Sequence, residues 1–121
     1  MPSRQTVEDF VATVESGDHV GAIERYYHEE ASMQENGGAP RAGRDLLIAN
    51  EKAALARLAE MRTLPAQRVF VDGDHVAINW IFEMVSKDGT VRRLDEIALQ
   101  EWRGEKIIRE RFYYDPAAMR S

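Results

Sequence analysis

The last third of the chain alternates apolar segments with short glycine-bearing turns, and this pattern constrains the fold more than any other feature. The turns are Asp-Gly-Asp at 72–74, Lys-Asp-Gly at 87–89 and Arg-Gly-Glu at 103–105. Charged turns of this length, containing glycine, reverse the chain in β-hairpins. We therefore predict a run of antiparallel strands formed by the apolar segments 69–71, 76–85, 97–102 and 107–114.

The first part of the chain has the pattern of helices. Thr6 is the predicted N-cap of a first helix, which Gly17 ends. Asp18 then caps a second helix, in which Tyr26 and Tyr27 share the apolar face. Apolar residues at helical spacing predict the buried stripe of the first helix, which consists of Val7, Phe10, Val11 and Val14.

The middle of the chain completes the order of elements. Residues 29–35 alternate weakly and predict a short edge strand, and residues 36–43 have the composition of a loop. Residues 44–61 form the longest helical pattern, which Pro65 follows. Helices that precede an antiparallel sheet are typical of an α+β fold. We expect one domain over residues 1–121, with a curved sheet whose concave face the helices cover.

Composition excludes several classes of function. The net charge is −5 and the arginines are dispersed, which argues against a nucleic-acid partner. Without cysteine the chain has no disulfide and no thiolate metal site. His19, His28 and His75 do not have the spacing of metal ligands, so we expect no metal ion. No apolar run approaches the ~20 residues of a membrane span, and a cytoplasmic location is the default expectation.

Four short strings, taken in order, resemble one family. They are Glu-Ser-Gly-Asp at 15–18, the segment 26–33, Pro-Arg-Ala-Gly at 40–43 and the segment 102–115. In this order they resemble the nuclear-transport-factor-2-like superfamily and, within it, the SnoaL-like (polyketide cyclase-like) group. The resemblance implies a cone-shaped half-barrel, in which a strongly bent, mostly antiparallel sheet and three N-terminal helices close a pocket. The superfamily includes cyclases, isomerases, epoxide hydrolases and dehydratases, but also proteins without demonstrated chemistry.

The resemblance carries over few catalytic residues. Glu35 falls where the isomerases have their general base and keeps a carboxylate. Phe10 stands in place of the oxyanion-hole tyrosine. Ala98 stands near the place of the protonated aspartate, which Asp95 or Glu96 would take if the hairpin register differs. Ile81 replaces the epoxide hydrolases' arginine, and Phe112 replaces the final-strand aspartate. The resemblance thus implies that none of the known catalytic sets is complete.

Strand parity predicts which side chains enter the pocket, because alternate residues of a strand point to opposite faces. On the last strand the more apolar face, expected to point inward, consists of Ile108, Glu110, Phe112 and Tyr114. On the preceding strand the family register places Glu96 and Gln100 inward and leaves Ile97 and Leu99 on the outer face. Since one layer of helices covers only one face, we expect a homodimer through the outer face.

The orientation of segment 76–85 stays open at this stage. Its alternating apolar residues favour core packing, whereas the family register turns them outward and sends Asn79 and Glu83 inward. The alternating residues are Val76, Ile78, Trp80, Phe82 and Met84.

Buried carboxylates are the candidates for chemistry. A carboxyl group among aromatic side chains has a raised pKa and suits general acid–base catalysis. We predict Glu110, Glu96 and Glu35 as catalytic candidates, and expect Glu96 and Glu110 to titrate as a coupled pair with one protonated near neutral pH. The predicted ligand-contacting residues are Phe10, Tyr27, Asn79, Trp80, Gln100 and Phe112.

Two hypotheses of function remain. The first is a cofactor-independent acid–base enzyme that isomerises, cyclises, dehydrates or hydrates a small apolar cyclic substrate. The second is a binding module that holds such a ligand without turnover. Phe10 and Phe112 favour binding, because relatives have polar groups there, and the three glutamates favour the enzyme.

Overall fold

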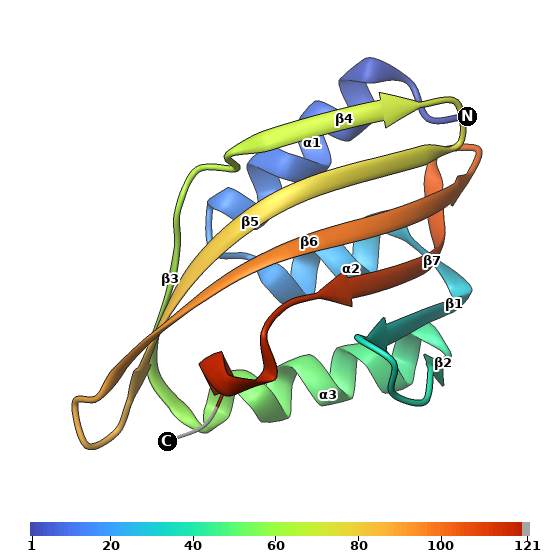
Figure 1. Cartoon of the computed structure of the whole chain (residues 1–121). Helices are drawn as coiled ribbons and strands as arrows, with labels where there is room; N and C mark the ends of the chain where they lie inside the picture. Colours follow the sequence, from blue (N-terminus) through green and yellow to red (C-terminus); the bar gives the residue numbers. More distant parts are fainter. Residues whose placement is uncertain (120–121) are drawn as a thin grey trace.

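The computed structural model describes residues 1–119, which form three helices, a strongly curved seven-stranded sheet and a C-terminal 3-10 turn (Figure 1). The helices are α1 (Arg4–Glu15), α2 (His19–Tyr26) and α3 (Arg44–Ala56), and the 3-10 turn η1 covers Pro116–Met119. The strands are β1 (Tyr27–Glu35), β2 (Arg41–Ala42), β3 (Leu58–Thr63), β4 (Arg68–Asp72), β5 (His75–Ser86), β6 (Val91–Arg103) and β7 (Lys106–Tyr113). Within these residues no helix is long and apolar enough to cross a membrane.

The sheet is mixed, with strand order β2-β1-β7-β6-β5-β3. β1 and β7 are parallel, and every other pair is antiparallel. The long strand β5 pairs with β4 along its first half and with β3 along its second half. The three predicted turns are confirmed, and each contains a glycine at positive φ: Gly73, Gly89 and Gly104. Glycine tolerates this backbone region because it has no Cβ.

The helices all lie on one side of the sheet, and the core fills the space between them (Figure 1). Phe10 of α1 contacts Trp102 of β6 edge to face, with 5.9 Å between ring centroids. All five alternating residues of β5 are buried on this inner side. Core packing therefore decides the orientation of β5, and the family-based alternative, with Asn79 and Glu83 inward, is wrong.

The predicted helix over residues 44–61 is too long. The structure ends α3 at Ala56, and the following residues form strand β3. Met61 pairs with Met84, and Thr63 pairs with Phe82. The free edge of β5 offers this segment backbone hydrogen bonds, and that long-range pairing outweighs the helical propensity of its Leu, Ala, Glu, Met and Arg.

Two further local expectations need correction. Strand β1 is interior, because it lies between β2 and β7, and Tyr27 begins it rather than ending α2. The N-cap of α1 is Ser3, whose Oγ accepts a hydrogen bond from the Thr6 amide at 3.1 Å. Asp18 caps α2 as predicted, accepting a bond from the Gly21 amide at 2.9 Å.

A β-bulge changes the parity of β7. The β6–β7 register shifts between Glu101 and Trp102, and Ile107 and Glu110 consequently both point inward. Ile108, predicted to be inward, is only partly buried. An extra residue on one strand reverses alternation at that point, and a count of residues from sequence cannot detect it.

Candidate functional site: a buried carboxyl pair in the internal cavity

A cavity of about 760 Å³ lies between the inner face of the sheet and the helices. Its walls are mainly aromatic and aliphatic, as in small-molecule sites generally, and they also contain several polar and charged side chains. The aromatic part of the wall consists of Phe10, Tyr27, Trp80, Phe82, Phe112 and Tyr114.

Glu110 is held at the cavity by a chain of hydrogen bonds. Trp102 Nε1 donates to Gln100 Oε1 at 3.0 Å, and Gln100 Nε2 donates to Glu110 Oε2 at 2.6 Å. The hydroxyl of Tyr27 donates to Glu110 Oε1. Gln100 and Glu110 are directly opposed on β6 and β7, so the sheet register itself brings them together.

Burial dominates the acidity of Glu110, which is 2% exposed. Loss of hydration raises its pKa to about 7, while the bonds from Gln100 and Tyr27 favour the carboxylate and oppose that rise. Glu110 can therefore exist as a carboxylate near neutral pH, with both oxygens held in position.

Glu96 is the second carboxyl group of the cavity, and it has no comparable support. It is 6% exposed, and its Oε2 has no hydrogen-bond partner. Burial, and after it the nearby charges of Glu110, Glu35 and Glu51, raise its pKa to about 8. At neutral pH Glu96 is thus the protonated member of the pair.

Glu35 lines the same cavity but is already partnered. Its Oε2 lies 3.3 Å from Arg41 Nη2, and its Oε1 accepts a bond from the Tyr114 hydroxyl at 3.2 Å. Burial, followed by the Glu35 charge, raises the pKa of Tyr114 to about 12. Glu35 is 46% exposed in its side chain, so it differs from the two buried glutamates.

Five of the six predicted ligand-contacting residues lie at the cavity wall or directly behind it. Phe10, Tyr27, Trp80 and Phe112 line the cavity. Gln100 is fully buried behind Glu110 and positions that carboxyl group.

Asn79 is the exception, since the structure places it on the outer face of the sheet. Its Nδ2 donates to Asp95 Oδ1 at 2.8 Å and to the Glu96 carbonyl oxygen at 3.0 Å. Asn79 therefore does not line the cavity, because its predicted inward position depended on the family register for β5, which core packing overrides.

Residues 7–110 match the family of SnoaL-like domains. The chain belongs to the SnoaL-like family. Among proteins of curated function, none is significantly similar to it. Solved structures share the fold closely but the sequence only distantly.

Three such structures illustrate the range of this fold. A candidate SnoaL-like polyketide cyclase from Mesorhizobium loti is 24% identical, with a TM-score of 0.77 over 91% of this chain and 97% of that one. TerC, crystallised with polyporic acid, is 19% identical, with a TM-score of 0.79 over 95% and 92%. An LEH-like epoxide hydrolase from M. tuberculosis is 15% identical, with a TM-score of 0.76 over 95% and 84%. At these identities the likeness shows the fold alone.

Sequence reasoning missed several polar groups of this SnoaL-like cavity, among them His19 and Arg92. His19 lies 2.7 Å from Thr63 Oγ1 through Nε2 and 3.5 Å from Glu51 Oε1 through Nδ1. Arg92 also lines the cavity. Arg92 lies on the same face of β6 as Glu96, so strand alternation in the sequence could have identified it. His19 and Glu51 come together only through the packing of helices α2 and α3. Within residues 1–119 no group of three or more His, Asp or Glu side chains could hold a metal ion.

Proposed function

We propose that this SnoaL-like protein is a cofactor-independent acid–base enzyme acting on a small, largely apolar cyclic substrate by isomerisation, cyclisation, dehydration or hydration. The observation that carries the proposal is the pair of buried carboxyl groups, Glu96 and Glu110, facing one cavity with pKa values near neutrality. Functional sites are where such strongly shifted carboxyl groups gather.

The two environments suit two different roles. Glu96, neutral at pH 7 and with a free oxygen, can donate a proton to a substrate oxygen. Glu110, whose carboxylate form is stabilised by Tyr27 and Gln100, can remove a proton from carbon. Aromatic walls exclude water and hold the ring of the substrate. After burial, the charge of Glu110 is the largest influence that raises the pKa of Glu96.

Exchange of carbon-bound hydrogen tests this function without a known substrate. 2-Tetralone, an apolar bicyclic ketone, exchanges its α-hydrogens in D₂O, and NMR follows the rate. We expect the wild type to accelerate exchange, and Glu110→Gln to lower the enzymic rate by about 10²–10⁴-fold. Binding, followed by tryptophan fluorescence, should change little, since Gln keeps the size of Glu.

Glu101→Gln is the matched control, because Glu101 lies on β6 but points to the outer side, where it pairs with Arg109 at 3.7 Å. This variant should accelerate the exchange of 2-tetralone as much as the wild type does. Equal exchange rates in wild type, Glu96→Gln and Glu110→Gln would contradict the enzyme.

The second candidate is a binding protein with the same cavity. The observation in its favour is the pair Phe10 and Phe112, which line the cavity where the resemblance implied polar catalytic groups. Binding of 2-tetralone that leaves its exchange rate unchanged would favour this candidate.

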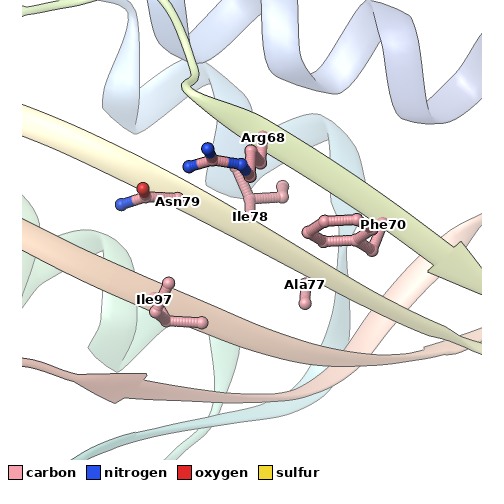
Figure 2. A pocket seen from close by; sticks show the side chains of 6 residues that line it. All are labelled: Arg68, Phe70, Ala77, Ile78, Asn79 and Ile97. Atoms are coloured by element: carbon pink, nitrogen blue, oxygen red, sulfur yellow. The ribbon is translucent and has the colours of Figure 1, made fainter.

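We also propose a homodimer through the outer sheet face. Apolar side chains there remain exposed, among them Phe70 at 64%, Ile97 at 43% and Leu99 at 42%. Figure 2 shows part of this face, where Phe70 and Ile97 border a shallow depression of about 250 Å³ together with Arg68 and Asn79. In residues 1–119 all helices lie on the other side of the sheet, and a second copy would bury this patch.

A further inference from the structure

Two buried side-chain atoms in residues 1–119 have no hydrogen-bond partner: Arg92 Nε and Glu96 Oε2. Both belong to β6, and both side chains line the same cavity. Buried polar atoms in folded proteins nearly always have partners, so each exception has a specific reason. Their common location indicates that one ligand completes both.

The strand register sets the geometry between these two atoms. Leu94 lies between Arg92 and Glu96 on the inner face of β6, and four residues of strand span about 13 Å between Cα atoms. The opposed inner residues of β5 are apolar, and the three cross-strand pairs along this wall are Trp80 with Glu96, Phe82 with Leu94 and Met84 with Arg92. The wall therefore has a carboxyl group at one end, a guanidinium at the other and an apolar surface between them.

Arg92 forms no ion pair with any carboxylate of the described residues. Asp88, in the β5–β6 turn, accepts a bond from the Thr90 amide, and Arg92 is the weakest of the influences that lower the pKa of Asp88. Of the cavity's other acids, Glu35 is paired with Arg41. A buried guanidinium nitrogen beside an apolar wall thus lacks the anion that it is suited to bind.

We propose that the substrate carries an acidic group, a carboxylate or an ionised enol or phenol, which Arg92 binds at the end of the cavity opposite Glu96. The apolar ring of the substrate lies between them, against Trp80, Phe82 and Leu94. Arg92 then determines specificity and orients the ring so that its reacting oxygen faces Glu96. This inference rests on the proposed function and names the class of substrate.

Matched ligands test it directly. 2-Naphthoate and 2-naphthamide have the same ring and nearly the same size, and differ in charge. Calorimetry or quenching of tryptophan fluorescence measures their affinities. We expect the wild type to prefer 2-naphthoate, and Arg92→Gln to weaken 2-naphthoate by about 10- to 100-fold while changing the affinity for 2-naphthamide little.

Arg93→Gln is the control, because Arg93 is the next residue but points to the outer side, 3.9 Å from Glu83. Arg93→Gln should bind both compounds like the wild type. Arg92→Lys keeps the positive charge but lacks Nε, so its affinity for 2-naphthoate should lie between those of the wild type and Arg92→Gln. Circular dichroism confirms that each variant is folded.

Equal wild-type affinities for the acid and the amide, or equal losses of both in Arg92→Gln, would overturn the inference. Absence of binding of both compounds would overturn it as well. Failure of the proposed function has a separate readout. In that case the rate of 2-tetralone exchange would be the same in the wild type, Glu96→Gln and Glu110→Gln.

Discussion

At the scale of single residues, two glutamates of similar burial have different pKa values because their neighbours differ. Glu110 accepts hydrogen bonds on both oxygens from Tyr27 and Gln100. Glu96 has a buried oxygen without a partner. Hydrogen bonds to a carboxylate favour ionisation, and burial opposes it. The protein thus keeps one carboxyl group neutral and allows the other to ionise, at some cost in stability.

That cost predicts the pH dependence of unfolding. Glu96 has a folded-state pKa of about 8 against the ordinary value of 4.5 for a glutamate, so between these pH values the folded state binds more protons than the unfolded state. The free energy of unfolding should therefore be highest near pH 5 and fall as pH rises to about 8, with a slope of at most about 1.4 kcal/mol per pH unit for each such proton.

Urea unfolding between pH 5 and 9 measures this slope. Glu96→Gln should flatten the dependence and be more stable than the wild type at pH 9, while Glu101→Gln should keep the wild-type slope. A wild-type stability that does not fall from pH 5 to 8 would show that Glu96 ionises like an exposed glutamate.

At the scale of elements, helix α2 positions one wall of the cavity. It places His19 and Ile23 there, and its first turn depends on the cap formed by Asp18. A capping carboxylate satisfies amide groups that a short helix of eight residues cannot pair internally.

Removing this cap should destabilise the protein. We expect Asp18→Ala to lower the free energy of unfolding by about 1 kcal/mol, because the Gly21 amide loses its acceptor. Asp18→Asn keeps an oxygen at the cap but removes the pairing with Arg25, at 3.4 Å, and should cost less. Chemical denaturation of both variants compares them, and equal losses would mean that the charge of Asp18, not its capping bond, is what matters.

At the scale of the whole molecule, the sheet has two apolar faces, and the helices cover one. The outer row joins Phe70, Ala77 and Leu99 through successive cross-strand pairs on β4, β5 and β6. Such a row, continuous across three strands, is the feature that the proposed dimer would bury.

Substitution of the outer face tests the dimer. Light scattering at micromolar concentration should give twice the chain mass for the wild type, and Leu99→Asp should shift the protein to monomer without unfolding it, since Leu99 is 42% exposed in the single chain. Leu46→Asp changes a similarly exposed leucine on α3, at 47%, and should leave the mass unchanged. A monomeric wild type would refute the proposal.

Local patterns in the sequence predicted the hairpins of β4 to β7 and the inward position of Glu110, whereas the inward position of Glu96 and Gln100 was predicted from the family register. Glycine-bearing turns are encoded within a few residues, and alternation on a strand repeats every second residue. Both signals can be recognised in the sequence without knowledge of the rest of the fold. The α+β class followed from the order of these elements.

Tertiary structure alone decided the remaining features. Residues 58–63 became a strand because β5 offered a free edge, and β1 became interior because β7 paired beside it. The inward orientation of β5 was settled by core packing, and the bulge near Trp102 decided that Ile107 is buried. These outcomes depend on contacts between residues far apart in the chain, and helix and strand propensities differ too little to decide against such contacts.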